Sequence, residues 1–332
     1  MRKYIIVGFL IVLFTHIFSF NSSAQGLKGT DFWFMMPQNN ESGSVECQTS
    51  YRLVIVSQFC LEDSVFLEIP NHGYSHAFSL ESGEYFEIDL LDLPGFNGNE
   101  NDLICTTVYD DLGSYQNVEN GIHLSSAQPI SAFLYFDKYA SADGETLLPT
   151  NMLGTKYVPS IRGQNNSAET HIVATEDDTE IRIDKVSDGS NQDQGITVVL
   201  NRGEVWSLSD QFDYSSDYPY NGVTTNDGNV VTTDKPVAVF SSMQCASIGQ
   251  NGNCDMLVST FMPTDRWETD YVSVQNLERR SITEAQGTLS IEGSGDYIHI
   301  VGEIGTNVSI TSLTDGTQNF TISAPVYSFA DQ

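Results

Sequence analysis

The motif Gly29-Thr30-Asp31-Phe32 near the start of the chain returns as Gly154-Thr155-Lys156-Tyr157 and, less closely, as Glu268-Thr269-Asp270-Tyr271. After each copy, short runs of β-branched and other apolar residues follow in the same order. Self-similarity at a long, nearly constant period indicates that one structural unit has been duplicated. The repeat therefore predicts a fold assembled from similar modules, which usually present surfaces rather than build a single buried cleft.

A second landmark of the repeat is a strand that opens with proline. Residues 121–133 align without gaps with residues 228–240, and Pro129 and Pro236 stand at the same place. Proline is tolerated at the start of a strand, where its missing N–H costs no hydrogen bond of the sheet. Apolar and charged residues alternate in Thr179-Glu180-Ile181-Arg182-Ile183, as in a strand with one buried and one wet face. No long segment has the apolar period of a helix, so the chain is predicted to be all-β.

These landmarks divide the chain into units. We expect complete β units at residues 25–150 and 151–265 and a partial third unit at residues 266–332. Each unit is expected to be a β-sandwich or jelly-roll-like module, so that the units follow in tandem. A single-domain β-propeller is the alternative, but its blades would repeat every ~40–45 residues and no such period is evident. The third unit lacks the proline-led strand. It is either a shortened cap or the front part of a longer polypeptide, and we favour the latter because a missing strand leaves a sheet edge unpaired.

Residues 1–24 have the features of a secretory signal peptide. Arg2 and Lys3 supply the positive start, residues 4–20 are almost all apolar, and residues 22–24 are small. An uncleaved anchor helix is the alternative, although an apolar run of this length is only marginally long enough to span a bilayer. The mature protein is therefore expected to be secreted, extracellular or at the cell surface, with no membrane insertion after signal cleavage.

The chain is strongly acidic. It has 14 lysines and arginines against 44 aspartates and glutamates, which gives a formal net charge of −30. Such a balance repels nucleic acids and anionic membrane surfaces, so we expect no nucleic-acid partner. The many carboxylates could also hold divalent cations loosely, but a solvated acidic surface is the simpler explanation.

The chain has five cysteines. Cys245 and Cys254 flank a short loop between two β-like segments, and export makes a disulfide between them chemically permissible. We predict this bridge, which would contribute on the order of 2–3 kcal/mol by closing the loop. Cys47, Cys60 and Cys105 leave one odd thiol, and their spacing alone does not choose the partners.

No metal site is predicted. His72 and His76 have the spacing that would face one ion on a helix, but a turn is expected between them. Asp188, Ser190 and Asp193 belong to an acidic loop that faintly resembles calcium loops but lacks their closing bidentate glutamate. A hairpin turn explains this loop equally well. Calcium is therefore a weak possibility, and no other cofactor is expected.

No catalytic site is predicted either. The chain has neither a Gly-x-Ser-x-Gly elbow nor a helix that such an elbow would introduce. His171 and His299 occupy matching positions of the repeat, which favours a structural role for both. Glycosidases need only two suitably separated carboxylates, and nothing in this sequence singles out such a pair.

Aromatic side chains supply the best binding candidates. Tyr214, Tyr218 and Tyr220 lie in a long polar loop, residues 211–226, where they have little core to fill. Mixtures of tyrosine with serine, aspartate and asparagine suit the recognition of a protein or a glycan. These three tyrosines are therefore the candidate ligand contacts, although a loop that packs on itself explains them equally well.

Several landmarks together resemble a known family. They are Pro236-Val237-Ala238-Val239-Phe240, Cys245, Cys254-Asp255-Met256-Leu257, Pro263-Thr264, Trp267 and Tyr271. In this order they resemble the N-terminal domain family of IgGFc-binding protein, which also occurs in secreted proteins of Bacteroidetes, and the resemblance extends over residues 26–332. Glu268 departs from the pattern, because the family usually has glycine after the tryptophan. The resemblance implies an extracellular adhesive or binding role and does not by itself imply immunoglobulin as the ligand.

These observations favour a secreted or cell-surface binding or adhesion module that is not an enzyme. Its ligand is expected to be an extracellular protein or a glycan. A structural spacer within a larger surface protein is the first alternative, and a carbohydrate-active hydrolase is the second.

Overall fold

The computed structural model describes the chain from residue 27 onward, with gaps. The described residues are 27–37, 49–96, 104–105, 120–138, 141–164, 168–185, 195–209, 223–225, 229–246, 255–271, 280–285, 288–293, 297–302, 305–312, 316–322 and 326–330. Within these ranges every regular element is a β-strand or a short 3₁₀ turn, which confirms the predicted all-β class. No helix in this described part is long and apolar enough to cross a membrane.

The first sheet is built around the long strand β8. Its seven strands are β1 (Gly29–Phe34), β3 (Thr49–Ser57), β4 (Leu61–Ile69), β5 (Tyr74–Leu80), β6 (Tyr85–Asp89), β8 (Ile122–Lys138) and β9 (Ser141–Thr146). The strand order is β5-β4-β8-β3-β6, and β1 and β9 pair with β8 as well. All these pairs are antiparallel.

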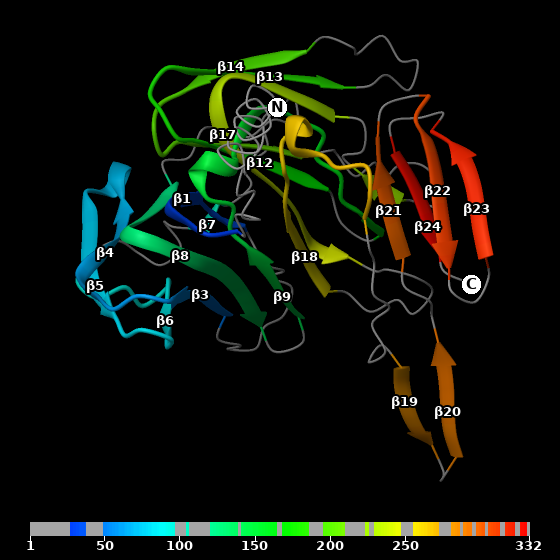
Figure 1. Ribbon diagram of the computed structural model, residues 1–332, viewed down its shortest axis with the longest axis horizontal. Helices are drawn as coiled ribbons and strands as arrows, with labels where there is room; N and C mark the ends of the chain where they lie inside the picture. Colours follow the sequence, from blue (N-terminus) through cyan, green and yellow to red (C-terminus); the bar gives the residue numbers. More distant parts are fainter. Residues whose placement is uncertain are drawn as a thin grey trace, which may run out of the picture.

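The second sheet repeats this plan around the long strand β17 (Figure 1). Its seven strands are β10 (Gly154–Tyr157), β12 (Glu169–Ala174), β13 (Thr179–Lys185), β14 (Ile196–Leu200), β15 (Val205–Ser209), β17 (Asn229–Ala246) and β18 (Asp255–Thr260). The order is β14-β13-β17-β12-β15, with β10 and β18 also paired to β17. The two sheets thus confirm a tandem, sandwich-like β architecture.

The strand registers of the two sheets match residue by residue. Phe133 of β8 pairs with Val54 of β3, and Phe240 of β17 pairs with His171 of β12. These two phenylalanines are the ones that the sequence alignment of residues 121–133 with 228–240 superimposes. The duplication predicted from the sequence is therefore present in the hydrogen bonding.

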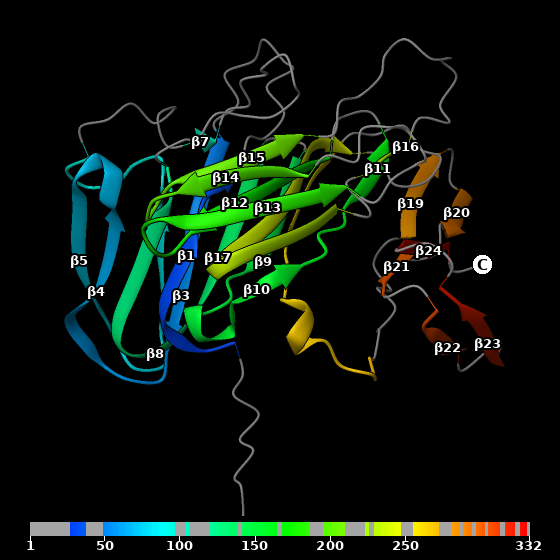
Figure 2. The same cartoon turned by 90° about the horizontal axis from the view of Figure 1, so that it is seen from above.

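The two sheets share one large core. The hydrophobic cluster on the inner face of the first sheet includes Leu53, Leu124 and Phe136, all fully buried. The same cluster also contains six residues of the second sheet, namely Val173, Val205, Ala238, Phe240, Met256 and Val258. The alternate residues of the second sheet, such as Ile172 and Val239, fill a core of its own. One face of the second sheet therefore packs against the inner face of the first (Figure 2).

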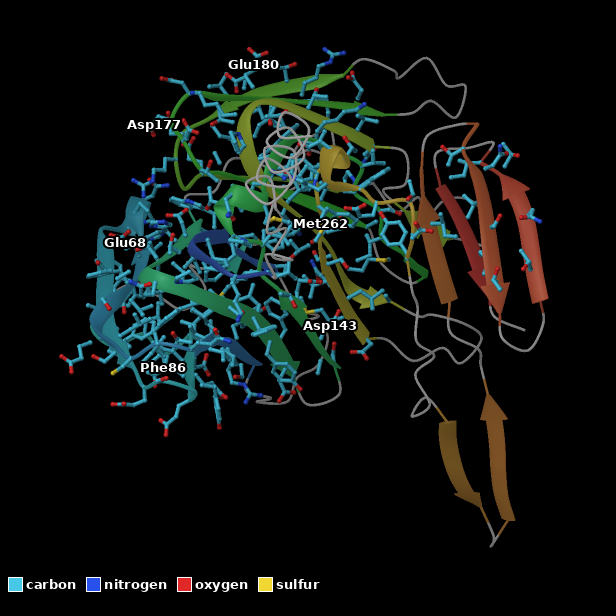
Figure 3. The ribbon with its side chains drawn as sticks, in the orientation of Figure 1. Glu68, Phe86, Asp143, Asp177, Glu180 and Met262 are labelled. Atoms are coloured by element: carbon cyan, nitrogen blue, oxygen red, sulfur yellow. The ribbon has the colours of Figure 1, made fainter. Side chains whose placement is uncertain are left out.

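The edges of β9 and β18 lie side by side and join the two units. The backbone N–H of Val258 donates to Asp143 at 2.7 Å, and that of Met256 donates to the Ser141 hydroxyl at 2.7 Å. In return, the N–H of Ala142 donates to Asp255 at 3.0 Å. Figure 3 shows Asp143 at this seam. These bonds satisfy backbone groups that an open sheet edge would leave unpaired.

A proline closes each unit onto its opening glycine. Pro149 precedes the 3₁₀ turn η3 (Thr150–Met152), and Pro263 precedes the turn η4 (Thr264–Arg266). A Cβ atom added to Gly29 would lie 2.2 Å from Cβ of Pro149, and one added to Gly154 would lie 2.6 Å from Cβ of Pro263. The glycine of the motif is therefore needed for this close approach.

The remaining described strands form two-stranded pairs and are outside both large sheets. They are β2 (Met36–Pro37) with β7 (Ile104–Cys105), β11 (Arg162–Gln164) with β16 (Val223–Thr225), β19 (Arg280–Ala285) with β20 (Thr288–Gly293), β21 (Tyr297–Val301) with β24 (Val326–Ala330), and β22 (Asn307–Ser312) with β23 (Gly316–Thr321). The turn η1 (Pro70–His72) follows β4. The third motif repeats one local contact, because the N–H of Glu268 donates to the Tyr271 hydroxyl as that of Gly154 donates to Tyr157.

Candidate functional site

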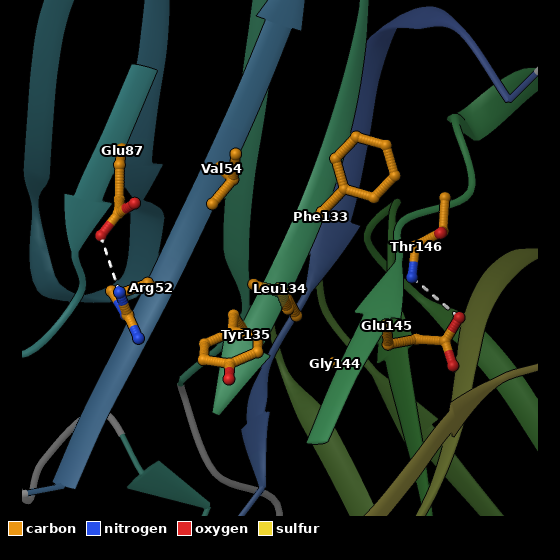
Figure 4. Close-up of a pocket in the computed structure, with 9 residues that line it drawn as sticks. All are labelled: Arg52, Val54, Glu87, Phe133, Leu134, Tyr135, Gly144, Glu145 and Thr146. Carbon is orange, nitrogen blue, oxygen red and sulfur yellow. Dashed lines mark hydrogen bonds and ion pairs between the residues drawn. The ribbon is translucent and has the colours of Figure 1, made fainter. Parts of the chain in front are cut away.

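The outer face of the first sheet carries exposed aromatic side chains. Phe133 and Tyr135 of β8 are 38% and 41% exposed, although both lie within the central strand. We call this surface the aromatic face and define it by Arg52, Val54, Glu87, Phe133, Tyr135 and Gly144. It lines a shallow, open hollow of about 530 Å³ (Figure 4).

The local sequence explains why these rings face outward. In residues 133–136, Phe-Leu-Tyr-Phe, side chains alternate between the two faces of the strand. Leu134 and Phe136 are buried in the shared core, so Phe133 and Tyr135 must point away from it. Val56 of β3, Phe66 of β4 and Tyr85 of β6 add further exposed apolar surface to the same side of the sheet.

The equivalent face of the second sheet is buried. It is the face that packs on the first unit, and there Phe240 is only 1% exposed. By register, Val54 corresponds to His171, Glu87 to Ser207, Phe133 to Phe240, Tyr135 to Ser242 and Gly144 to Val258. The same surface thus occurs in both sheets. In the second sheet it is covered by the first unit, whereas in the first sheet no described unit covers it.

Tyr135 and Gly144 form a large-and-small pair across β8 and β9. They are register partners, and a Cβ atom added to Gly144 would lie 3.3 Å from Cδ2 of Tyr135. One edge of the tyrosine ring thus lies beside the bare backbone of Gly144. In the second sheet the equivalent pair is Ser242 and Val258, with the small residue on the other strand. The glycine leaves room for a ring that lies over the sheet.

Charged groups border the aromatic rings. The guanidinium of Arg52 lies 4.8 Å from the centre of the Tyr135 ring, a cation–π distance. It also donates to Glu87 at 3.0 Å and to Asp137 at 3.5 Å. The hydrogen bond with Glu87 raises the pKa of Arg52 further above its ordinary value. The buried Nε of Arg52 has no hydrogen-bond partner among the described residues. The face therefore combines flat apolar rings with both donors and acceptors.

A second hollow, of about 410 Å³, lies where the two units meet. Trp33 of β1 lines it and is stacked on His123, with ring centroids 4.4 Å apart. Arg202, which belongs to the turn between β14 and β15, lies 5.0 Å from the centre of the Trp33 ring. Asn71 of η1 also reaches the Arg202 carbonyl, at 3.5 Å. These contacts tie a turn of the second sheet to the first sheet.

His123 is held between two carboxylates. Its Nε2 lies 2.7 Å from Asp31 and its Nδ1 lies 2.8 Å from Glu68. Burial alone lowers the pKa of His123, but the hydrogen bonds to these carboxylates outweigh it and raise that pKa. Burial likewise raises the pKa of Asp31, and the hydrogen bonds from His123 and Thr150 outweigh it, so that this pKa is lowered. A histidine that donates from both nitrogens has no lone pair left to act as a base.

A further histidine is completely buried where the two sheets meet. His171 lies 2.7 Å from the hydroxyl of Ser207 through Nδ1 and 2.7 Å from that of Ser242 through Nε2. Ser242 in turn donates to Glu169 at 3.1 Å. Serine, histidine and carboxylate thus meet, but none of them reaches solvent. This network fits the structural role predicted for His171.

The tyrosines predicted as ligand contacts, Tyr214, Tyr218 and Tyr220, lie outside the described residues. The same holds for the acidic loop with Asp188, Ser190 and Asp193, and for Cys254 and the side chain of its predicted partner Cys245. Among the other cysteines, Cys60 is a free, exposed thiol.

His72 and His76, whose spacing would suit one metal ion on a helix, lie in different elements. His72 ends the turn η1 and lies 3.2 Å from the side-chain oxygen of Asn120. His76 belongs to β5 and stacks on Phe78. In the described ranges no group of three or more histidine, cysteine or acidic side chains is placed to hold a metal ion.

The sequence contained a signal for the aromatic face that the prediction missed. Comparing the copies position by position shows Tyr135 where the second unit has Ser242, next to the matching Phe133 and Phe240. An aromatic residue that replaces a small polar one on the same strand face indicates a different use of that face. Recognising it requires knowing which face is covered, which the sequence does not state.

Comparison with known proteins identifies the family. No curated protein matches the chain significantly. A family model described as IgGFc binding protein matches residues 143–330, from β9 through the second sheet to β24. This range covers more than half of the chain, and the first sheet repeats the strand order of the matched second sheet. The chain therefore belongs to the IgGFc-binding protein family.

Proposed function

We propose that this chain is a non-catalytic binding module of a secreted or cell-surface protein, and that the aromatic face is its contact surface for an extracellular ligand. Membership of a binding-type family supports the general role. The features of a signal peptide in residues 1–24 support export. The buried states of His171 and His123 leave neither of these histidines free to act on a substrate.

The observation that carries the proposal is the exposure of the aromatic face. Tandem repeats bury equivalent surfaces against their neighbours, and terminal units usually replace that surface by a polar one. Here the first unit keeps Phe133 exposed and adds Tyr135 beside it. Tyrosine and arginine are also the residues most enriched at the centres of binding surfaces. A spacer would gain nothing from such a surface.

The test is binding to immobilised extracellular glycoproteins, with the Fc fragment of immunoglobulin G as one probe because of the family match. The chain is compared with a Phe133→Ser/Tyr135→Ser variant in biolayer interferometry. We expect the variant to lose at least about tenfold in affinity for any probe that the parent retains. Equal retention by both proteins would show that this face is not the contact surface.

The predicted tyrosine loop is a separate candidate contact and needs its own variant. Replacing Tyr214, Tyr218 and Tyr220 by serine in one protein tests it against the same probes. If only this variant loses binding, the contact surface is the loop. If the parent chain retains none of the probes, the result favours a structural spacer.

A further inference from the structure

We propose that the aromatic face binds a neutral oligosaccharide, whose sugar rings stack on Phe133 and Tyr135. This inference rests on the proposed function, because it names the ligand class of the same surface. A pyranose ring has an apolar face of C–H groups and a rim of hydroxyls. Its recognition therefore needs a flat aromatic ring beneath it and hydrogen-bonding groups beside it.

The first requirement is met along β8. Phe133 and Tyr135 are two residues apart on one strand face, so their Cα atoms are about 6.8 Å apart. One edge of the Tyr135 ring lies beside the backbone of β9, where Gly144 has no side chain. Figure 4 shows the two rings in succession along β8, with Gly144 on the neighbouring strand. Two successive rings on one face of the same strand suit two sugar units of one chain.

The second requirement is met by the charged border. Sugar hydroxyls donate and accept hydrogen bonds, and the face offers both kinds of partner. The guanidinium of Arg52 donates, and the half-exposed carboxylate of Glu87 accepts. These two groups already bind each other, so their positions are fixed before a ligand arrives. Fixed donors and acceptors lose little entropy on binding.

The same ion pair argues against a close protein interface. The side chains of Arg52 and Glu87 are 31% and 37% exposed, and they lie next to the rings. Packing a dry protein surface on them would remove the water around both charges, which is costly. An oligosaccharide brings hydroxyls that replace this water. The observations therefore favour a hydrated ligand over an apolar partner surface.

The charge of the face selects among oligosaccharides. Glu87 and Asp137 outnumber Arg52 at the border, and the whole chain carries a net charge of −30. Sulfated, sialylated or uronic-acid glycans would be repelled by this field. A neutral chain would not be repelled. The shallow, open shape of the hollow also suits a segment of a chain better than a single enclosed sugar.

The test uses the full chain and a panel of neutral hexasaccharides built from glucose, xylose, mannose or N-acetylglucosamine, with polygalacturonate and heparin as anionic comparators. Affinities are measured by isothermal titration calorimetry. We expect at least one neutral hexasaccharide to bind and the anionic chains not to bind. Removing one ring by Phe133→Ala or Tyr135→Ala should weaken binding about two- to tenfold, the range expected for one aromatic contact.

The repeat itself supplies the decisive variant. The double change Tyr135→Ser/Gly144→Val installs the pair that the second sheet already carries as Ser242 and Val258, so the strand pairing should tolerate it. This variant should melt near the parent temperature and weaken hexasaccharide binding at least as much as Tyr135→Ala does. Phe66→Ser is the control, because Phe66 is 40% exposed on β4 and outside the hollow. It should leave the affinity unchanged.

Several outcomes would overturn the inference. One is that no neutral hexasaccharide binds at millimolar concentration, and another is that binding survives the loss of both rings. A glycoprotein that is retained equally before and after enzymatic removal of its glycans would show a protein ligand, which leaves the proposed function intact. Self-association that the double variant abolishes would assign the face to a second copy of this chain. Failure of the proposed function looks different, since no probe of any class would then respond to these variants.

Discussion

Phe133 and Phe240 occupy the same register position in two sheets of identical strand order, yet the first is 38% exposed and the second 1%. The difference arises because the units are stacked head to tail. The second sheet places its Phe240 face on the inner face of the first sheet, while the first sheet has no described unit on its own Phe133 face. One surface of the repeat is thus used for packing in one copy and is exposed in the other.

This pair allows a direct test of the stacking. Phe240→Ala should remove a buried ring from the shared core and lower the free energy of unfolding by about 3–5 kcal/mol. Phe133→Ala, the same change at the equivalent position, should cost less, because 38% of that residue is already exposed to solvent. Urea unfolding followed by tryptophan fluorescence measures both. Equal losses for the two variants would contradict the head-to-tail packing.

The cluster of Asp31, His123 and Glu68 predicts a pH dependence. The pKa of His123 is raised, so its contribution to stability is complete below its unfolded value of about 6.5 and is lost as the pH rises through the folded value. The pKa of Asp31 is lowered, so its contribution is present above about 3.9 and is lost as the pH falls through its folded value. Both contributions are complete only between about pH 4 and 6.5.

The measurement compares unfolding free energies of the parent and His123→Gln between pH 4 and 9. Other carboxylates titrate in both proteins, so the difference between the two curves isolates the histidine. We expect this difference to be largest near pH 5 and to shrink above pH 7. A difference that does not change with pH would show that His123 is neutral in the folded protein.

The sequence was sufficient to predict the fold class and the duplication, because both depend on local patterns. Alternation in residues such as Ile181 and Arg182 reports one buried and one wet face, and the aligned prolines Pro129 and Pro236 fix the equivalence of the long strands. The packing of one sheet on the other could not be predicted in the same way. Val205 and Trp206 are both buried, although they point to opposite faces, because each face of β15 meets a different core.

The candidate site was harder to predict than the fold. Whether Tyr135 fills a core or meets solvent depends on what lies above its strand face, and this is decided by strands far away in the sequence. In the sequence, the tyrosines of a polar loop are the more apparent candidates, because polar loops usually run over the surface. A large apolar side chain within a strand is normally read as core.

The buried hydrogen bonds of His171 predict that this position, where the two sheets meet, needs a polar side chain. His171→Leu introduces an apolar residue of similar size and removes the hydrogen-bond partner that His171 gives the Ser207 hydroxyl. A buried hydroxyl left without a partner costs about 1–3 kcal/mol. Val54→Leu at the equivalent place in the first sheet should change stability by less than about 0.5 kcal/mol. Thermal unfolding of the two variants tests the contrast, and equal melting temperatures would refute it.

The glycine that opens each of the first two motifs should not tolerate a larger residue, because a proline packs directly against it. The motif does not require glycine for its own turn, because Glu268 donates its N–H to Tyr271 at 2.9 Å much as Gly154 does to Tyr157 at 2.8 Å. Glycine is required because a proline packs against it, and for Gly29 this proline is Pro149.

Gly29→Ala should therefore lower the free energy of unfolding by about 1–3 kcal/mol, the usual cost of inserting a methyl group into a filled space. Gly83→Asn serves as the control, since Gly83 has a φ of 78° with nothing within 4 Å of an added Cβ atom, and asparagine tolerates that conformation. Urea denaturation measures both variants.

The proline contact also predicts a rescue of stability in a double variant, because Pro149→Ala in the Gly29→Ala background removes the clashing ring. Recovery of part of the lost stability in that double variant would support the contact, and a simple sum of the two losses would contradict it.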